Sequence, residues 1–315
     1  MEFILFAISI AVLLIASNYF LNSAVEIARI LKMPEVIIGA TIVALGTTLP
    51  ETIVSSMGAF KGLGSVAYGN SMGSIICNTS LVAALGIAFM CGPIDKKSLK
   101  SPIAFFFFTF VVYSFIAIKF RGFNRIAGIV LISIFVVYVF TLLKTKSEAK
   151  EVAKEAEDIK DIVPETSIGK LILIIIVSAA FVSISSNILV DNGVIIAGRL
   201  GVPDKVIAIT MMALGTSLPE LVTTITAITK NKRELSIGNI IGANFLNLTT
   251  VNGISALVRP FSIEGINYND LIVVLVVMLI MSIPPLLTGK THRWQGLLML
   301  AIYISYCIAQ YAGVI

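Results

Sequence analysis

Long apolar segments dominate this chain and restrict it to one class of fold. A helix needs about 20 residues to cross the ~30 Å hydrocarbon core of a bilayer, and apolar runs of that length recur along the sequence. We place ten of them, at roughly 2–22, 36–59, 66–90, 101–119, 124–143, 168–190, 205–228, 235–258, 269–287 and 294–313. Because 57% of the residues are hydrophobic and only 13% are charged, the sequence predicts an all-α polytopic membrane protein with ten transmembrane helices.

The positively charged residues are distributed unevenly over the connecting loops. With the N-terminus outside, the inner loops hold 16 of the 23 lysines and arginines and the outer loops hold 7, and cytoplasmic loops are generally the richer ones. We therefore expect a multi-pass protein of the cell (plasma) membrane with both termini outside. Since the positive residues are scattered over short loops, we expect no nucleic-acid partner. We expect the chain to contact the lipid bilayer, and no obligatory protein partner is evident.

The chain is also an internal duplication with an offset of 169 residues. Between 34–51 and 203–220, ten of eighteen positions are identical, and the matches further along include Gly and Asn. Each copy holds five apolar segments, an odd number, so the second copy enters the membrane from the opposite side. We expect a first five-helix repeat at 1–143, a cytoplasmic linker at 144–167 and a second, inverted five-helix repeat at 168–315.

A helix-breaking motif occurs once in each repeat. Residues 44–51 read ALGTTLPE and residues 213–220 read ALGTSLPE. Pro50 and Pro219 have no N–H to donate to the preceding turn, so each predicts a kink. Carbonyls freed inside a membrane must be satisfied by protein, water or an ion. We expect the kinks to direct carbonyls into an internal cavity, near Ala44, Thr47, Ala213 and Thr216.

A glutamate follows each proline directly. A charged carboxylate at mid-membrane costs at least ~3 kcal/mol and by default indicates function. Glu51 and Glu220, related by the inversion, would approach each other and repel unless a cation lies between them. Calcium binds 6–8 oxygens in flexible geometry, which the two carboxylates, the Thr47 and Thr216 carbonyls, and water or the Asn78 and Asn247 amides could supply.

At these residues a family resemblance emerges. The stretches GATIVALGTTLPE…GNSMGSIICN and AITMMALGTSLPE…GNIIGANFLN resemble the paired repeats of the calcium/cation antiporter superfamily, most closely its prokaryotic sodium/calcium exchangers. The resemblance implies ten helices in an inverted repeat that exchange calcium for sodium by alternating access. It implies that Glu51, Glu220, Thr47 and Thr216 bind calcium. The sodium ligands it implies are Ala44, Ala213, Ser74, Thr48 and Ser217, with Asn78 in the central position.

Two positions depart from that family pattern. Members of this type commonly carry a serine where this chain has Ala243, and an aspartate where it has Asn247. One hydroxyl and one carboxylate are therefore absent. One calcium, two sodium ions or two protons neutralise a site with two carboxylates, so the sodium coupling is the least constrained part of the resemblance.

Other functions compete with this interpretation. A calcium/proton antiporter could use the same two glutamates, and a passive cation channel could place carboxylates in a pore, although channels usually arrange them as rings around an axis. An enzyme is not expected. The three cysteines lack metal or redox spacing, the single His292 stands alone, and no phosphate-binding or cofactor motif is present.

Overall fold

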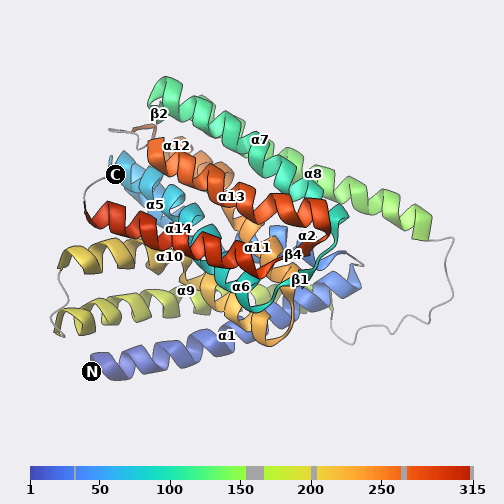
Figure 1. The fold of residues 1–315 in the computed structure, drawn as a ribbon, viewed down its shortest axis with the longest axis horizontal. Coiled ribbons are helices and arrows are strands. Elements are labelled where there is room, and N and C mark those ends of the chain that lie inside the picture. Colours follow the sequence, from blue (N-terminus) through green and yellow to red (C-terminus); the bar gives the residue numbers. More distant parts are fainter. Residues whose placement is uncertain (32, 154–166, 200–203, 264–267, 313–315) are drawn as a thin grey trace.

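The chain folds into a bundle of helices with short connections (Figure 1). A computed structural model describes residues 1–31, 33–153, 167–199, 204–263 and 268–312. In the first half the helices are α1 (Glu2–Ile30), α2 (Glu35–Ile38), the π-helical η1 (Gly39–Val43), α3 (Ala44–Thr47), α4 (Leu49–Phe60), α5 (Gly64–Cys77), the π-helical η2 (Asn78–Ala83), α6 (Ala84–Phe89), α7 (Lys96–Phe120) and α8 (Arg125–Ala153).

The second half repeats much of this order. Its helices are α9 (Ile168–Arg199), α10 (Asp204–Thr229), α11 (Arg233–Leu246), the π-helical η4 (Asn247–Val251), α12 (Asn252–Val258), α13 (Tyr268–Thr288) and α14 (Arg293–Tyr311). Two short antiparallel ladders join the halves: β1 (Gly92–Pro93) pairs with β4 (Lys290–Thr291), and β2 (Gly122–Phe123) pairs with β3 (Phe261–Ser262). The halves are therefore tied together at their loops as well as through the helices.

The helices have the length and composition of membrane spans. Within the described residues, seven are long and apolar enough to cross a bilayer, and the bent pair Glu35–Thr47 and Leu49–Phe60 adds an eighth. The prediction of a helical, multi-pass membrane protein is thus confirmed, while ten spans stay a prediction. Much of the proposed linker at 144–167 lies outside the described residues.

Two spans form the centre of the bundle. The most apolar window of Gly64–Phe89 is 72% buried and that of Arg233–Val258 is 83% buried, whereas the other continuous spans are 28–39% buried. Figure 1 shows α1 and α9 side by side at one edge, and α7 and α8 together at the opposite edge. The outer helices thus shield the two central spans from lipid.

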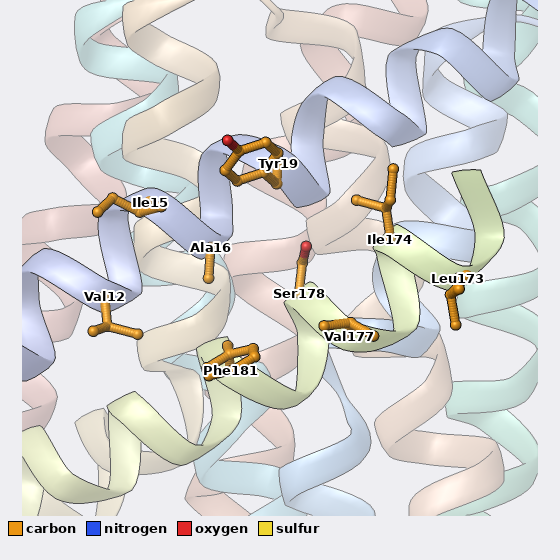
Figure 2. A pocket seen from close by; sticks show the side chains of 9 residues that line it. All are labelled: Val12, Ile15, Ala16, Tyr19, Leu173, Ile174, Val177, Ser178 and Phe181. Carbon is orange, nitrogen blue, oxygen red and sulfur yellow. The ribbon is translucent and has the colours of Figure 1, made fainter. Parts of the chain in front are cut away.

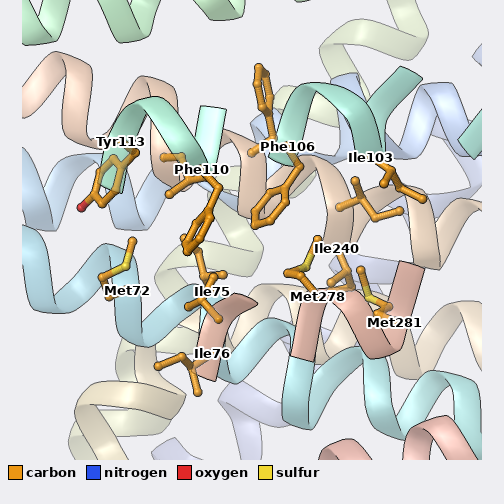
Figure 3. Packing of buried hydrophobic residues seen from close by; sticks show 14 of the residues in the cluster. Met72, Ile75, Ile76, Ile103, Phe106, Phe110, Tyr113, Ile240, Met278 and Met281 are labelled. Atoms are coloured by element: carbon orange, nitrogen blue, oxygen red, sulfur yellow. The ribbon is translucent and has the colours of Figure 1, made fainter. Parts of the chain in front are cut away.

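A large apolar cluster fixes α7 and α13 against the central spans. Figure 3 shows Phe106 and Phe110 of α7 facing Ile75 of α5, Ile240 of α11 and Met278 of α13. All five side chains are at most 6% exposed. Because lipid is as apolar as these side chains, close van der Waals contact rather than water exclusion is what holds them together.

Glycines allow the tightest helix contact, where α2 and η1 cross α11. A Cβ atom added at Gly238 would lie 2.2 Å from the Val36 carbonyl oxygen, and one at Gly242 would lie 2.5 Å from the Ala40 Cα. A Cβ at Gly39 would lie 2.3 Å from the Leu235 carbonyl oxygen. Backbone meets backbone here, as small residues permit in membrane bundles, and the contact joins the first half directly to the second.

This crossing predicts a strong effect for a single methyl group. Gly238→Ala should destabilise the protein by ~1–3 kcal/mol, because two backbones must move apart to admit the Cβ. Thermal denaturation in detergent, followed by size-exclusion chromatography, measures the loss. Gly169→Ala is the matched control, since a Cβ there meets no atom of the described residues within 4 Å. Equal melting temperatures for the two variants would contradict the close crossing.

Candidate ion-binding site

The first proline motif interrupts its helix as the sequence predicts. The chain passes from π-helical η1 through α3 to Thr48, whose backbone leaves the helical region at φ −87° and ψ 2°, and Pro50 then lies in the first turn of α4. The two parts of the span are bent by 48°. The Ala44 carbonyl is not free, however: it accepts hydrogen bonds from the Thr48 N–H at 2.9 Å and the Thr47 hydroxyl at 3.3 Å.

The second proline motif behaves differently. The helix α10 runs without a break from Asp204 to Thr229, with Pro219 inside it. A proline removes only one helical hydrogen bond, the one that its missing N–H would donate to the Gly215 carbonyl, and in a packed membrane bundle neighbouring groups can satisfy what it frees. The Thr223 hydroxyl donates to the carbonyl of Pro219 itself. The expected interruption at the second motif is therefore wrong as a break in the helix. The side chain of Ala213 lies outside the described residues.

The two motif glutamates are completely buried. Glu51 and Glu220 are each 0% exposed, and no hydrogen bond from the described residues reaches any of their four carboxylate oxygens. If both were charged, the two carboxylates would repel each other in this site of low dielectric constant. Buried carboxylates without partners are costly, so this arrangement requires a neutralising cation or protons.

Polar neighbours hold the backbone around Glu51. The Asn70 side chain donates to the Glu51 carbonyl at 3.2 Å and to the Ser55 hydroxyl at 2.9 Å. From the second repeat, Asn239 accepts a hydrogen bond from the Thr47 hydroxyl at 3.3 Å. These bonds leave both carboxylate oxygens of Glu51 available while they fix the turn that carries it.

Further buried oxygens lie on the helices that carry the two glutamates and on the helices that contact these. Ser74 of α5 and Thr216 of α10 share a hydrogen bond of 3.1 Å between their hydroxyls. Several buried polar atoms have no hydrogen-bond partner among the described residues: the Thr48 and Ser217 hydroxyls, both side-chain polar atoms of Asn78, and the Asn247 Oδ1. Most such atoms in native proteins find a protein, water or ion partner, so their concentration here points to a bound ion.

Both asparagines begin π-helical turns. Asn78 opens η2 and Asn247 opens η4, at equivalent places in the two repeats. A π-helical turn leaves part of the backbone hydrogen-bonding pattern irregular and is frequent at functional sites. Asn252 supports the second turn by donating to the Asn247 carbonyl at 2.7 Å and to the Ser71 hydroxyl at 2.8 Å.

Sequence reasoning did not identify Asn252. Its counterpart in the first repeat is Ala83, so comparing the two copies gives no signal there.

Most of the site residues predicted from the sequence are buried in the structure. Ala44, Thr47, Thr48, Ser74, Asn78, Ser217 and Asn247 are 0–3% exposed. Thr216 is half-buried.

The donor set is suited to hard cations. Carboxylate, hydroxyl, amide and carbonyl oxygens favour calcium and similar ions, whereas soft metals prefer thiolate or imidazole. Within the part of the chain that the structure describes, no group of three or more His, Cys, Asp or Glu residues could hold a metal ion. The site is therefore one pair of carboxylates enlarged by neutral oxygens, buried at the centre of a membrane bundle. Fold and site together define a multi-pass membrane protein with a buried, oxygen-rich candidate site for a cation.

Comparisons with known proteins identify the family to which the chain belongs. The family model described as sodium/calcium exchanger protein matches residues 1–144 and 170–312, and the chain belongs to this family. It is 32% identical over 301 residues to an uncharacterised membrane protein of Methanocaldococcus jannaschii, covering 95% of this chain and 94% of that protein. It is 25% identical to the sodium/calcium exchanger MaX1 of Methanosarcina acetivorans, over 98% of this chain and 97% of that one.

Solved structures agree with the family assignment. The fold matches the sodium-calcium exchanger NCX_Mj soaked with sodium and strontium, with a TM-score of 0.81 and 28% sequence identity. The match covers 98% of this chain and 97% of that chain. A second structure of the same exchanger, soaked with zero sodium and calcium, matches this chain with a TM-score of 0.82.

Cation binding at the glutamates predicts a calcium-dependent stability. A ligand at 100 times its dissociation constant stabilises a folded protein by ~2.7 kcal/mol, so calcium should raise the melting temperature of the purified protein. In Glu51→Gln and Glu220→Gln this rise should disappear, while the ion-free melting temperature stays equal or increases because the repulsion is gone. Thermal shift with and without calcium measures both. A full calcium response in either variant would exclude that glutamate as a ligand.

Proposed function

We propose that this protein is a secondary active antiporter that exchanges calcium for sodium across a membrane by alternating access. The observation that carries the proposal is the pair of fully buried, unpartnered carboxylates of Glu51 and Glu220. Membership of the sodium/calcium exchanger family supports it, as do the similarities to MaX1 and NCX_Mj, which are named as exchangers.

The proposed architecture is two inverted five-helix repeats, 1–143 and 168–315, joined by a cytoplasmic linker at 144–167, with both termini outside the cell membrane. Three features support it. Both halves contain a Pro-Glu motif in their second helical region, both contain a π-helical turn that begins with asparagine, and positive residues concentrate in the loops assigned to the inner side.

In the proposed site, Glu51 and Glu220 bind calcium through their carboxylates, and the carbonyls of Thr47 and Thr216 add oxygens. Sodium ions use the same carboxylates together with neutral oxygens from both repeats. The proposed sodium ligands are Ser74, Thr48, Ser217, Asn78, Asn247 and the carbonyls of Ala44 and Ala213. Calcium and sodium then compete directly, because either set of ions neutralises the same two charges.

Alternating access requires part of the bundle to move relative to the rest. The α1–α9 pair is the proposed moving element. Figure 2 shows an apolar groove between these helices, of about 480 Å³, lined on one side by α1 residues such as Ala16 and Tyr19 and on the other by α9 residues such as Val177 and Phe181. The groove lies within this pair, and lining residues such as Tyr19 and Phe181 are more than half exposed. The pair therefore lies on the outer surface of the bundle, where its movement does not require the glycine crossing at Gly238 to part.

A calcium/proton antiporter is the second candidate, because two buried carboxylates can release calcium by taking up two protons. A passive channel has less support. The described side chains of the proposed site are nearly all 0–3% exposed, so they do not line an open pore.

The experiment that separates the candidates is calcium uptake into proteoliposomes. Sodium, potassium and proton gradients are imposed one at a time, and ⁴⁵Ca²⁺ accumulation is measured. We expect an outward sodium gradient alone to drive uptake. Uptake driven by protons alone would establish the proton antiporter instead, and calcium flux without any counter-ion gradient would favour a channel.

The same assay tests the two glutamates. Glu51→Gln and Glu220→Gln should each reduce sodium-driven calcium uptake by at least ~100-fold, since one remaining carboxylate cannot neutralise a divalent ion in a low-dielectric site. Glu26→Gln is the control, because Glu26 forms a partly exposed ion pair with Arg29 on the surface. Wild-type rates in either site variant, with the protein folded by size-exclusion chromatography, would refute the site.

A further inference from the structure

The two repeats differ at one position of the site in a way that bears on how many ions it holds. Ser74 in the first repeat corresponds to Ala243 in the second. The Ser74 hydroxyl lies 3.1 Å from the Thr216 hydroxyl, so this part of the site presents two adjacent hydroxyls. The 169-residue offset relates Ser74 and Thr216 to Ala243 and Thr47, and Ala243 has no side-chain oxygen.

The surroundings of Thr47 show the consequence of that missing oxygen. Ala243 is fully buried and packs with Ala44, one turn before Thr47. The Thr47 hydroxyl turns elsewhere, to the Asn239 Oδ1 and the Ala44 carbonyl, each at 3.3 Å. The pairing of hydroxyls found at Thr216 is therefore absent at Thr47 among the described residues. One of two symmetry-related places for a monovalent cation is complete, and the other lacks an oxygen.

The charge of the site also limits the number of sodium ions that it can hold. Glu51 and Glu220 are its two carboxylates, and the polar residues at the two π-helical turns, Asn78 and Asn247, are neutral amides. The site can therefore carry a charge of −2. Calcium neutralises that charge alone, and so do two sodium ions. Any further sodium would leave an uncompensated positive charge in a buried site that is short of one oxygen, and such a charge is strongly unfavourable.

We propose that this chain exchanges two sodium ions for each calcium ion, so that transport moves no net charge, and that Ala243 sets this count by withholding an oxygen from a third sodium. This inference rests on the proposed sodium/calcium exchange. It specifies the stoichiometry of that same site, and it makes transport independent of the membrane potential.

The test measures the calcium gradient that the purified protein reaches in proteoliposomes with a fixed sodium gradient. Potassium and valinomycin clamp the membrane potential at 0 or 100 mV of either sign. We expect the final calcium gradient to be the same at all three potentials. Moving one extra charge per cycle would change it about 50-fold per 100 mV, and such a change would overturn the proposal.

A second measurement keeps the two proposals distinguishable. Sodium should displace ⁴⁵Ca²⁺ from the purified protein with a limiting logarithmic slope of two. A slope of three overturns the ion count even if exchange occurs. If sodium-driven uptake is absent but the slope is two, the proposed exchange fails while the ion count holds. If sodium displaces no calcium, both proposals fail.

The decisive variant is Ala243→Ser, which restores the hydroxyl that the repeat symmetry calls for. We expect it to raise the slope from two toward three and to make the final calcium gradient depend on potential. Ala256→Ser is the matched control: it adds the same group to the same span, where Ala256 packs against Gly128 away from the site, and it should behave as wild type. A folded Ala243→Ser protein with slope two and no response to potential would contradict the role of Ala243.

Discussion

The repulsion between two buried carboxylates is the constraint around which the rest of this structure is organised. Glu51 and Glu220 lie with no exposed surface and no hydrogen-bond partner among the described residues, in a protein whose surroundings are hydrocarbon. Such a pair is stable only with a cation or protons present. The stability of the folded protein therefore depends on what neutralises this pair, and the proposed exchange of calcium for two sodium ions keeps the charge of the site balanced.

Close helix packing and irregular helices make that site possible together. The glycines at the crossing of η1 and α11 bring the backbones of the two halves into contact, so side chains from both can reach a common chamber. The break at Thr48 and the π-helical turns that begin at Asn78 and Asn247 then supply polar groups which regular helices would hide. Burial of the central spans, 72% and 83% over their most apolar windows, keeps these irregular turns away from lipid.

The sequence alone predicted the membrane class, the carboxylate pair and the kink at Pro50, because each depends on residue chemistry that repeats at a fixed offset. It could not predict the π-helical turns, which have no distinctive residue pattern and arise from packing. Nor did it predict that α10 would continue through Pro219, since the packing of neighbouring helices decides whether a proline breaks a helix or is accommodated. Asn252 escaped notice because its counterpart is Ala83, and comparison of repeats detects only what both copies keep.

Differences between the repeats bear on the balance between the two states of the proposed transport cycle. In a perfectly symmetric inverted repeat, the states open to either side would be equivalent and equally populated. Here the contacts at the two ends differ. Glu2 and Arg199 pair at 2.9 Å where α1 begins and α9 ends, whereas Lys232 and Glu35 pair at 2.7 Å where α11 and α2 begin. The first pair joins the two peripheral helices to each other, as expected if they move as a unit in the proposed cycle. The second joins the halves at the base of the glycine crossing, in the part of the bundle that is proposed to stay fixed.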